Sequence, residues 1–377
     1  MGAGHDAVAG ELAERLRARG HSARIQDVLA LLPPGVGPAL RAGYRGAVRH
    51  VPQLYAWIYA AFLAAGPDGQ RGRSGPDGGA GAVARPGSAP LAALAERALM
   101  DVVDRWEPDA VISTFHLSAQ VTGRLRTRGV LDVPSVVTVV DFAVHRGWLH
   151  PGNDMHLCVT ESAARTAEAV TGRAAEATGP VVPERFSESY AARTGEGRYG
   201  HWHREFERLA PGRPLVLLSA GAWGVGAGLP GTARQLVAHG FCPVLLCGRD
   251  ERLRRRAASV PGAIALGWVE SMAELMAAAH ALVDNAAGQT AAQALATGLP
   301  VIGYRPLPGH GAEGIREMVA AGVTELAGDE GELANALEKV VSPGPVRELR
   351  VGRGRALFRT DAAQRIADVT RAGVRTA

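Results

Sequence analysis

Two loops in the first half of the chain carry the side chains best suited to acid–base chemistry. In the first loop, His5 and Asp6 follow the glycine turn Gly2-Ala-Gly4 and open a predicted helix. Glycines let the backbone approach a ligand closely, and a helix start offers free N–H groups and a positive dipole end. A histidine at this place could take a proton from a hydroxyl group. The alternative is a tight turn in which Asp6 caps the helix.

The second loop, residues 138–151, is dense in titratable groups. Asp141 ends a strongly β-branched predicted strand, and His145, Trp148 and His150 follow within nine residues. The unperturbed pKa of histidine lies close to neutrality, so His5 and Asp141 are the two candidate general bases. The alternatives are a structured loop with satisfied polar groups, or a metal site formed by Asp141, His145 and His150.

Three loops in the second half are suited to binding a ligand. Residues 219–226 place Gly221 and Gly224 around Trp223, and such small residues suit close passage of a ligand or of another domain. A strand-to-helix turn is the alternative. Residues 306–314 contain Gly309 and His310, which could contact a sugar; a simple proline–glycine turn is the alternative there.

The turn Gly288-Gln289-Thr290 lies between these two loops. It follows a predicted strand and opens a predicted helix, whose N–H groups could hold a diphosphate. Gln293 lies about one helical turn further on the same face. The alternative is a capping box, in which the Thr290 and Gln293 side chains satisfy the first N–H groups of the helix.

The elements that must position these loops form two alternating series. Each series predicts a doubly wound α/β domain with a parallel sheet, in which ligands bind beyond the carboxyl ends of the strands. The predicted strands are 23–28, 110–114, 135–140 and 155–160 in the first series, and 214–219, 243–247, 263–267, 281–284 and 300–304 in the second. The predicted organisation is a first domain at 1–183, a linker at 184–213 and a second domain at 214–377, with a Gly/Pro-rich flexible insertion at 66–90.

The predicted helix at 6–19 lacks the strand that should open a doubly wound domain. This suggests the hypothesis that the native chain starts upstream, and that Met1 stands for an internal valine whose GTG codon was taken as a start. Sequencing the N-terminus of the native protein tests it.

Composition excludes several classes of protein. The formal charge is +4, from 41 basic and 37 acidic residues, and no basic block is interleaved with aromatics, so we expect no nucleic-acid partner. The longest apolar run, Leu54–Ala65, is shorter than the roughly 20 residues of a membrane-spanning helix, and no signal peptide is visible. We therefore expect a cytoplasmic protein. Cys242 and Cys247 read as buried strand residues.

Several stretches, taken in order, resemble the monogalactosyldiacylglycerol synthase family and, more distantly, the lipid II-forming N-acetylglucosaminyltransferase of peptidoglycan synthesis. They span nearly the whole chain outside the insertion. They are Gly2-Ala-Gly-His5, Leu54-Tyr-Ala-Trp-Ile-Tyr59, residues 138–151, Gly221-Ala-Trp-Gly-Val-Gly226, Gly267-Trp-Val-Glu-Ser-Met272 and residues 285–300.

The resemblance implies a GT-B fold, in which an N-terminal acceptor domain and a C-terminal donor domain face each other across a cleft. It implies inverting transfer of a hexose from a UDP-sugar to a lipid hydroxyl, with no obligatory metal or other cofactor. By the same resemblance, Val269 meets the uracil, Gly288, Gln289 and Thr290 hold the diphosphate, Gln293 faces the ribose, and Gly309 and His310 face the sugar, while Gly221, Trp223 and Gly224 belong to the donor side. His5 or Asp141 is the implied base.

The acceptor and membrane side of this resemblance involves Tyr55, Trp57, His145 and Trp148. The aromatic segment 54–63, with Arg41, Arg45 and Arg49 nearby, could dock peripherally on an anionic membrane surface, and core packing is the alternative. We expect that surface to be the inner face of the plasma membrane. The sequence predicts no oligomeric state.

Two departures from the family pattern bear on activity. Such families usually have Glu at the position of Gln293, and a loop reading Gly-Gln-Glu where this chain has Gly309-His310-Gly311. The alternatives are therefore a catalytically weak nucleotide-sugar-binding protein, a UDP-sugar epimerase, or a transferase that acts on a non-lipid acceptor.

Overall fold

The computed structural model describes residues 3–50, 89–194, 200–219 and 228–374. Most of the expected insertion at 66–90 lies outside the described residues. So do five of the residues singled out from the sequence: Tyr55, Trp57, Gly221, Trp223 and Gly224.

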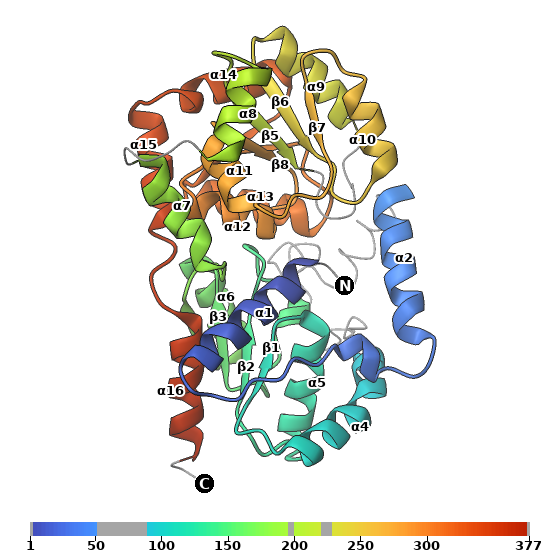
Figure 1. Ribbon diagram of the computed structural model, residues 1–377. Coiled ribbons are helices and arrows are strands. Elements are labelled where there is room, and N and C mark those ends of the chain that lie inside the picture. Colours follow the sequence, from blue (N-terminus) through green and yellow to red (C-terminus); the bar gives the residue numbers. More distant parts are fainter. Residues whose placement is uncertain (1–2, 51–88, 195–199, 220–227, 375–377) are drawn as a thin grey trace, which may run out of the picture.

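The first domain is built on a four-stranded parallel sheet with the order β1-β2-β3-β4 (Figure 1). Its strands are β1 (Val111–Ser113), β2 (Ser135–Thr138), β3 (Met155–Cys158) and β4 (Ala174–Ala177). Its helical segments are α1 (Ala3–Ala18), η1 (Val28–Leu31), α2 (Val36–His50), α4 (Ala89–Trp106), α5 (His116–Thr127), η4 (Arg146–Trp148) and α6 (Glu161–Thr171).

Helices cover both faces of this sheet because alternate strand residues point to opposite sides. Val136 packs in one apolar cluster with Leu12 of α1, and Val137 packs in another with Ala119 of α5. Strands β2 and β3 are buried throughout, as expected for a parallel sheet between helices.

The second domain has a six-stranded parallel sheet with the order β10-β9-β8-β5-β6-β7. Its strands are β5 (Leu215–Ser219), β6 (Cys242–Leu246), β7 (Ile264–Leu266), β8 (Ala281–Asp284), β9 (Val301–Tyr304) and β10 (Thr324–Ala327). The helices that follow them are α9 (Leu229–Ala238), α10 (Glu251–Ala258), α11 (Met272–Ala278), α12 (Gln289–Ala296), α13 (His310–Ala320), α14 (Glu330–Val341) and α15 (Pro345–Arg355). The strand order reverses between β5 and β8, so the ligand crevice of a doubly wound domain lies there.

The expected linker at 184–213 forms two helices, α7 (Glu184–Thr194) and α8 (His201–Leu209). Phe186 and Phe206 are both buried in the apolar cluster that also holds Leu217 and Leu282 of the second sheet. These helices therefore pack as part of the second domain, although their sequence is polar overall.

The last helix, α16 (Ala362–Val374), returns to the first domain (Figure 1). Ala363 and Ile366 pack with Leu12 of α1 and Leu157 of β3. The stretch 214–377 is therefore not one body around the second sheet, because an apolar face at its end is buried against the first sheet.

The strand predicted at 23–28 does not form: residues 21–27 lie outside any helix or strand, and η1 begins at Val28. The other eight predicted strands are present, within a few residues at their ends. Cys242 and Cys247 are buried and unpaired, as expected for core residues.

Candidate active site

The loop after β8 is shaped by one buried carboxylate. Asp284 is 3% exposed and accepts hydrogen bonds from the backbone N–H groups of Ala286 and Ala287, at 3.0 and 2.7 Å. Ala287 has φ 49°, a left-handed conformation that non-glycine residues rarely adopt and that often occurs at functional sites. This turn delivers the chain to the first residue of α12.

Helix α12 begins without the capping box that the sequence allowed. Its N-cap is Gly288, so Thr290 lies inside the helix, and no side chain caps its first N–H groups in the part of the chain that the structure describes. The Gln293 side chain is partly exposed and makes no hydrogen bond to another described residue. The first turn of α12 thus keeps the N–H groups and the positive dipole end that bind anions.

The start of α13 lies beside the start of α12. Leu307 N–H donates to Asn285 C=O at 2.8 Å, and a Cβ added at Gly311 would come within 2.9 Å of that carbonyl oxygen. The N-cap of α13 is Gly309, at φ 82°, and among the described residues it too lacks a side-chain cap. Two helix N-termini therefore meet at the crevice, which is a favourable place for a diphosphate.

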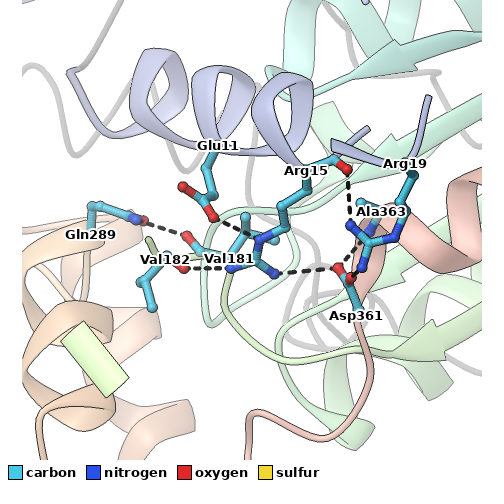
Figure 2. A network of polar contacts seen from close by, with 8 residues as sticks. All are labelled: Glu11, Arg15, Arg19, Val181, Val182, Gln289, Asp361 and Ala363. Carbon is cyan, nitrogen blue, oxygen red and sulfur yellow. Dashed lines mark hydrogen bonds and ion pairs between the residues drawn. The ribbon is translucent and has the colours of Figure 1, made fainter. Parts of the chain in front are cut away.

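The side chain of Gln289 is used differently from the sequence expectation. Its Nε2 donates to the carbonyl oxygen of Val181 at 2.8 Å, and its Cβ lies 3.3 Å from where a Cβ at Gly4 would stand (Figure 2). Gln289 therefore joins the two domains through its side chain, and only its backbone N–H remains available to a diphosphate. Beside it, Arg15 bridges Glu11 and the Val182 carbonyl oxygen.

His5 lies at the same domain interface, in the first turns of α1. Its Nδ1 is 2.9 Å from the carbonyl oxygen of Thr114. A carbonyl oxygen only accepts, so Nδ1 carries the proton and Nε2 keeps a free lone pair. Burial lowers the pKa of His5, and the Asp141 carboxylate opposes that shift. The ring is therefore neutral at pH 7 and ready to accept a proton.

Asp141 is held by the two aromatic residues predicted to be near it. Trp148 Nε1 donates to its Oδ2 at 2.9 Å, and His145 Nε2 lies 3.7 Å from the same oxygen. Trp148 is 0% exposed and His145 is 3% exposed, so neither side chain is available to a membrane surface. Both form the wall that orients a partly exposed carboxylate.

Two further histidines complete this cluster. His310, on the second domain, has its pKa lowered by burial, and the nearby Asp141 carboxylate opposes this. His116, missed in the sequence reading, opens α5 with its ring centroid 5.3 Å from that of His145. Its Nδ1 is buried with no hydrogen-bond partner among the described residues. The rule that ligands bind at strand ends, applied to residues 114–116, would have indicated it.

The remaining predicted residues lie at separate places. Val269 is partly buried beyond the carboxyl end of the edge strand β7. His150 accepts a hydrogen bond from the N–H of Gly152 at its Nδ1. Across the described ranges, no three His, Cys, Asp or Glu side chains are grouped so that they could hold a metal ion.

His116 makes a pH prediction. Burial, and then the neighbouring His5, lower its pKa to about 3. The unfolded chain, with an ordinary histidine pKa, binds the proton first, so stability is full above about pH 6.5 and is lost as the pH falls. Between pH 7.5 and 5, His116→Gln should lose roughly 2 kcal/mol less unfolding free energy than the unmodified chain in urea titrations. Equal losses would contradict this assignment.

Comparison with known proteins agrees with this arrangement. The family model described as monogalactosyldiacylglycerol (MGDG) synthase matches residues 85–182. A processive diacylglycerol beta-glucosyltransferase of Staphylococcus carnosus is 25% identical over 264 residues, covering 64% of this chain and 65% of that protein. One of Bacillus subtilis is 26% identical over 225 residues, covering 58% and 56%. The matches thus span less than two thirds of these relatives.

Solved structures decide the fold. MurG of Acinetobacter baumannii superposes with a TM-score of 0.54 at 14% identity, covering 98% of this chain and 96% of that one. A Staphylococcus aureus MnaA–UDP structure superposes with a TM-score of 0.55 at 13% identity, covering 74% and 79%. The chain has the GT-B fold. The resemblance of this GT-B protein to the MGDG synthase family is confirmed as well.

Proposed function

We propose that this GT-B protein is an inverting glycosyltransferase that moves a hexose from a UDP-sugar to the hydroxyl of a diacylglycerol-like lipid. The observation that carries the proposal is the pair of uncapped helix starts, α12 and α13, joined across the domain interface to the cluster around His5 and Asp141. The similarity to diacylglycerol glucosyltransferases supports the lipid acceptor.

In this proposal the N–H groups at Gly288, Gln289 and Thr290 hold the diphosphate of the donor. Gln293 faces the ribose, Val269 the uracil, and Gly309 and His310 the sugar. The two helix dipoles stabilise the charge that develops on the leaving UDP, so the reaction needs no obligatory metal.

The acceptor side of the reaction follows from the geometry at His5. The lipid hydroxyl oxygen attacks the anomeric carbon from the side opposite UDP, its proton passes to His5 Nε2, and the bond to the diphosphate breaks. The configuration at that carbon inverts. The Asp141 carboxylate stabilises the imidazolium that forms.

A thermal-shift panel tests the donor assignment. UDP, UDP-glucose, UDP-galactose and UDP-GlcNAc should each raise Tm, while other nucleotides should do so less. No shift with any uridine compound would overturn the donor assignment. Turnover with diacylglycerol then separates a transferase from a protein that only binds the nucleotide sugar.

Gln293 favours the second candidate, a catalytically weak nucleotide-sugar-binding protein, because an amide binds a ribose diol less strongly than a carboxylate. Gln293→Glu is therefore expected to tighten UDP binding about tenfold in isothermal titration. Gln26→Glu, the same change at an exposed position of the first domain, is the control and should leave the affinity unchanged. Equal affinity of the Gln293→Glu variant and the unmodified chain would remove Gln293 from the ribose site.

We further propose that the protein docks peripherally on the inner face of the plasma membrane. No described helix has both the length and the apolar character to cross a bilayer. The support for docking is the aromatic segment 54–63 and the lipid substrates named for the relatives. Trp57→Ala should reduce co-sedimentation with anionic liposomes severalfold. Equal binding of both forms, or no binding by either, would count against docking.

A further inference from the structure

A cavity of about 250 Å³ lies beside β1, away from the crevice of the second domain. Its lining is mainly apolar and comes from four separate segments. These include Leu12 and Leu16 of α1, Leu99 and Val103 of α4, Ile112 of β1, and Ile25.

One wall of the cavity is the free edge of the first sheet. Strand β1 pairs with β2 alone and is the last strand of its sheet. Val111 N–H donates to Pro134 C=O, towards β2, at 2.9 Å. In a parallel ladder the next residue points the opposite way, so the N–H and C=O groups of Ile112 face the cavity. Val111 and Ile112 are only partly buried, unlike every residue of β2 and β3.

The opposite wall is the segment 22–27, which the sequence predicted as a strand. Its N–H groups donate no backbone hydrogen bond to another residue that the structure describes. Ile25 is 52% exposed. This segment has β-strand composition and lacks a ladder partner on the side of the cavity.

Helices close the cavity above and below. Ile112 packs with the apolar cluster of α1, and Val111 packs with the cluster that holds Leu99 of α4. A space with a strand edge on each side and a helix on each face is the environment of a central strand in a doubly wound sheet.

We propose that the cavity is the seat of a further parallel β-strand, formed by polypeptide joined to the N-terminal end of α1. The contact of His5 with Thr114 places the first turns of α1 at the carboxyl end of β1. A strand that ends there runs parallel to β1 and connects through α1 to the segment 22–27, as a strand–helix–strand unit. A strand of five residues spans about 17 Å, so it extends ahead of Met1.

The added strand changes the topology of the domain. The order becomes the segment 22–27, the new strand, and then β1 to β4. The chain then reverses direction across the sheet between the new strand and β1. His5 and His116 lie at that reversal, which is where a doubly wound sheet binds its ligand.

A lipid chain is the competing occupant, and the walls disfavour it. An acyl chain would cover the backbone N–H and C=O groups of Ile112 and of residues 22–27 without bonding them. Each polar group left in this way costs roughly 1–3 kcal/mol. A strand satisfies the same groups.

Two extended forms of the full chain test the proposal. One carries Val-Val-Ile-Val-Ala ahead of Gly2, and the matched control carries Gly-Ser-Gly-Ser-Gly. Residue-resolved hydrogen exchange should show the Ile112 amide and the amides of 23–27 exchanging at least tenfold more slowly in the first form than in the control. The Val111 amide, already bonded to β2, should be unchanged, and Tm should rise by several degrees.

Unchanged exchange at Ile112 and at 23–27 in the apolar extension would overturn the proposal. So would slowing of those amides by dodecanoate in the unextended chain without slowing by the extension, which would assign the cavity to an acyl chain. Exchange at the Leu217 amide of β5 reports whether each extended form is folded.

Discussion

His5→Ala is expected to lower kcat for hexose transfer about 10³-fold while leaving the Tm shift produced by UDP unchanged. The bond from His5 Nδ1 to Thr114 fixes the tautomer, so Nε2 is the atom that takes the acceptor proton. Removing the ring removes the base without altering the starts of α12 and α13, where the donor binds. Initial rates with saturating UDP-sugar and diacylglycerol, together with the thermal shift, measure the two effects separately.

His21→Ala is the matched control for His5→Ala, because His21 lies just beyond the other end of α1 and is not part of the cluster. It should retain full turnover. Full turnover in His5→Ala would remove His5 from the role of base. Loss of the UDP shift in that variant would instead give it a part in binding the donor.

Asp141→Asn is expected to lower kcat about 10²-fold and to shift the acid limb of the pH–rate profile to lower pH. The Asp141 carboxylate raises the pKa of His5 against the effect of burial. Without that charge the His5 pKa falls, so His5 stays deprotonated to lower pH and becomes a weaker base. The amide oxygen of the variant can still accept from Trp148 Nε1, so the loop should keep its shape.

The pH profile separates this role from a purely structural one. A variant that merely loosened the loop would lose activity without moving the acid limb. Asp101→Asn, an exposed change on α4, is the control and should match the unmodified chain in both rate and profile. An unmoved limb with full activity would show that Asp141 does not act on His5.

Much of the fold was predictable because strong local patterns agree with the final packing. The stretch 135–140 is β-branched and apolar on both faces, which suits a strand between two layers of helices. The carboxyl-end rule then located Asp141, whose partner Trp148 follows only seven residues later. Site residues that follow strands within one short loop can be found in this way.

The failures share a different cause, which is that distant contacts decide them. Thr290 and Gln293 form a good local capping pattern, but the Asp284 carboxylate binds Ala286 and Ala287 N–H and sets the turn so that α12 starts after Gly288. The amide of Gln289 is engaged by Val181, a residue 108 positions away.

The segment 23–28 and α16 show the same limit. A strand needs a neighbour to bond with, and the composition of residues 23–28 does not supply one. The apolar face of α16 has no property that tells one sheet from the other, so its return to α1 was not predictable.

The return of α16 means that the polypeptide passes between the domains twice. The two passages touch, because a Cβ added at Gly179 would lie 1.9 Å from the carbonyl oxygen of Leu357. Two tethers at a single place act as the knuckle of a hinge, so any opening of one domain from the other has its pivot there. Gly179, at φ 86°, has no side chain to obstruct that pivot. The His5 cluster and the starts of α12 and α13 lie on the leaves of this hinge, where a small rotation changes the gap between donor and acceptor.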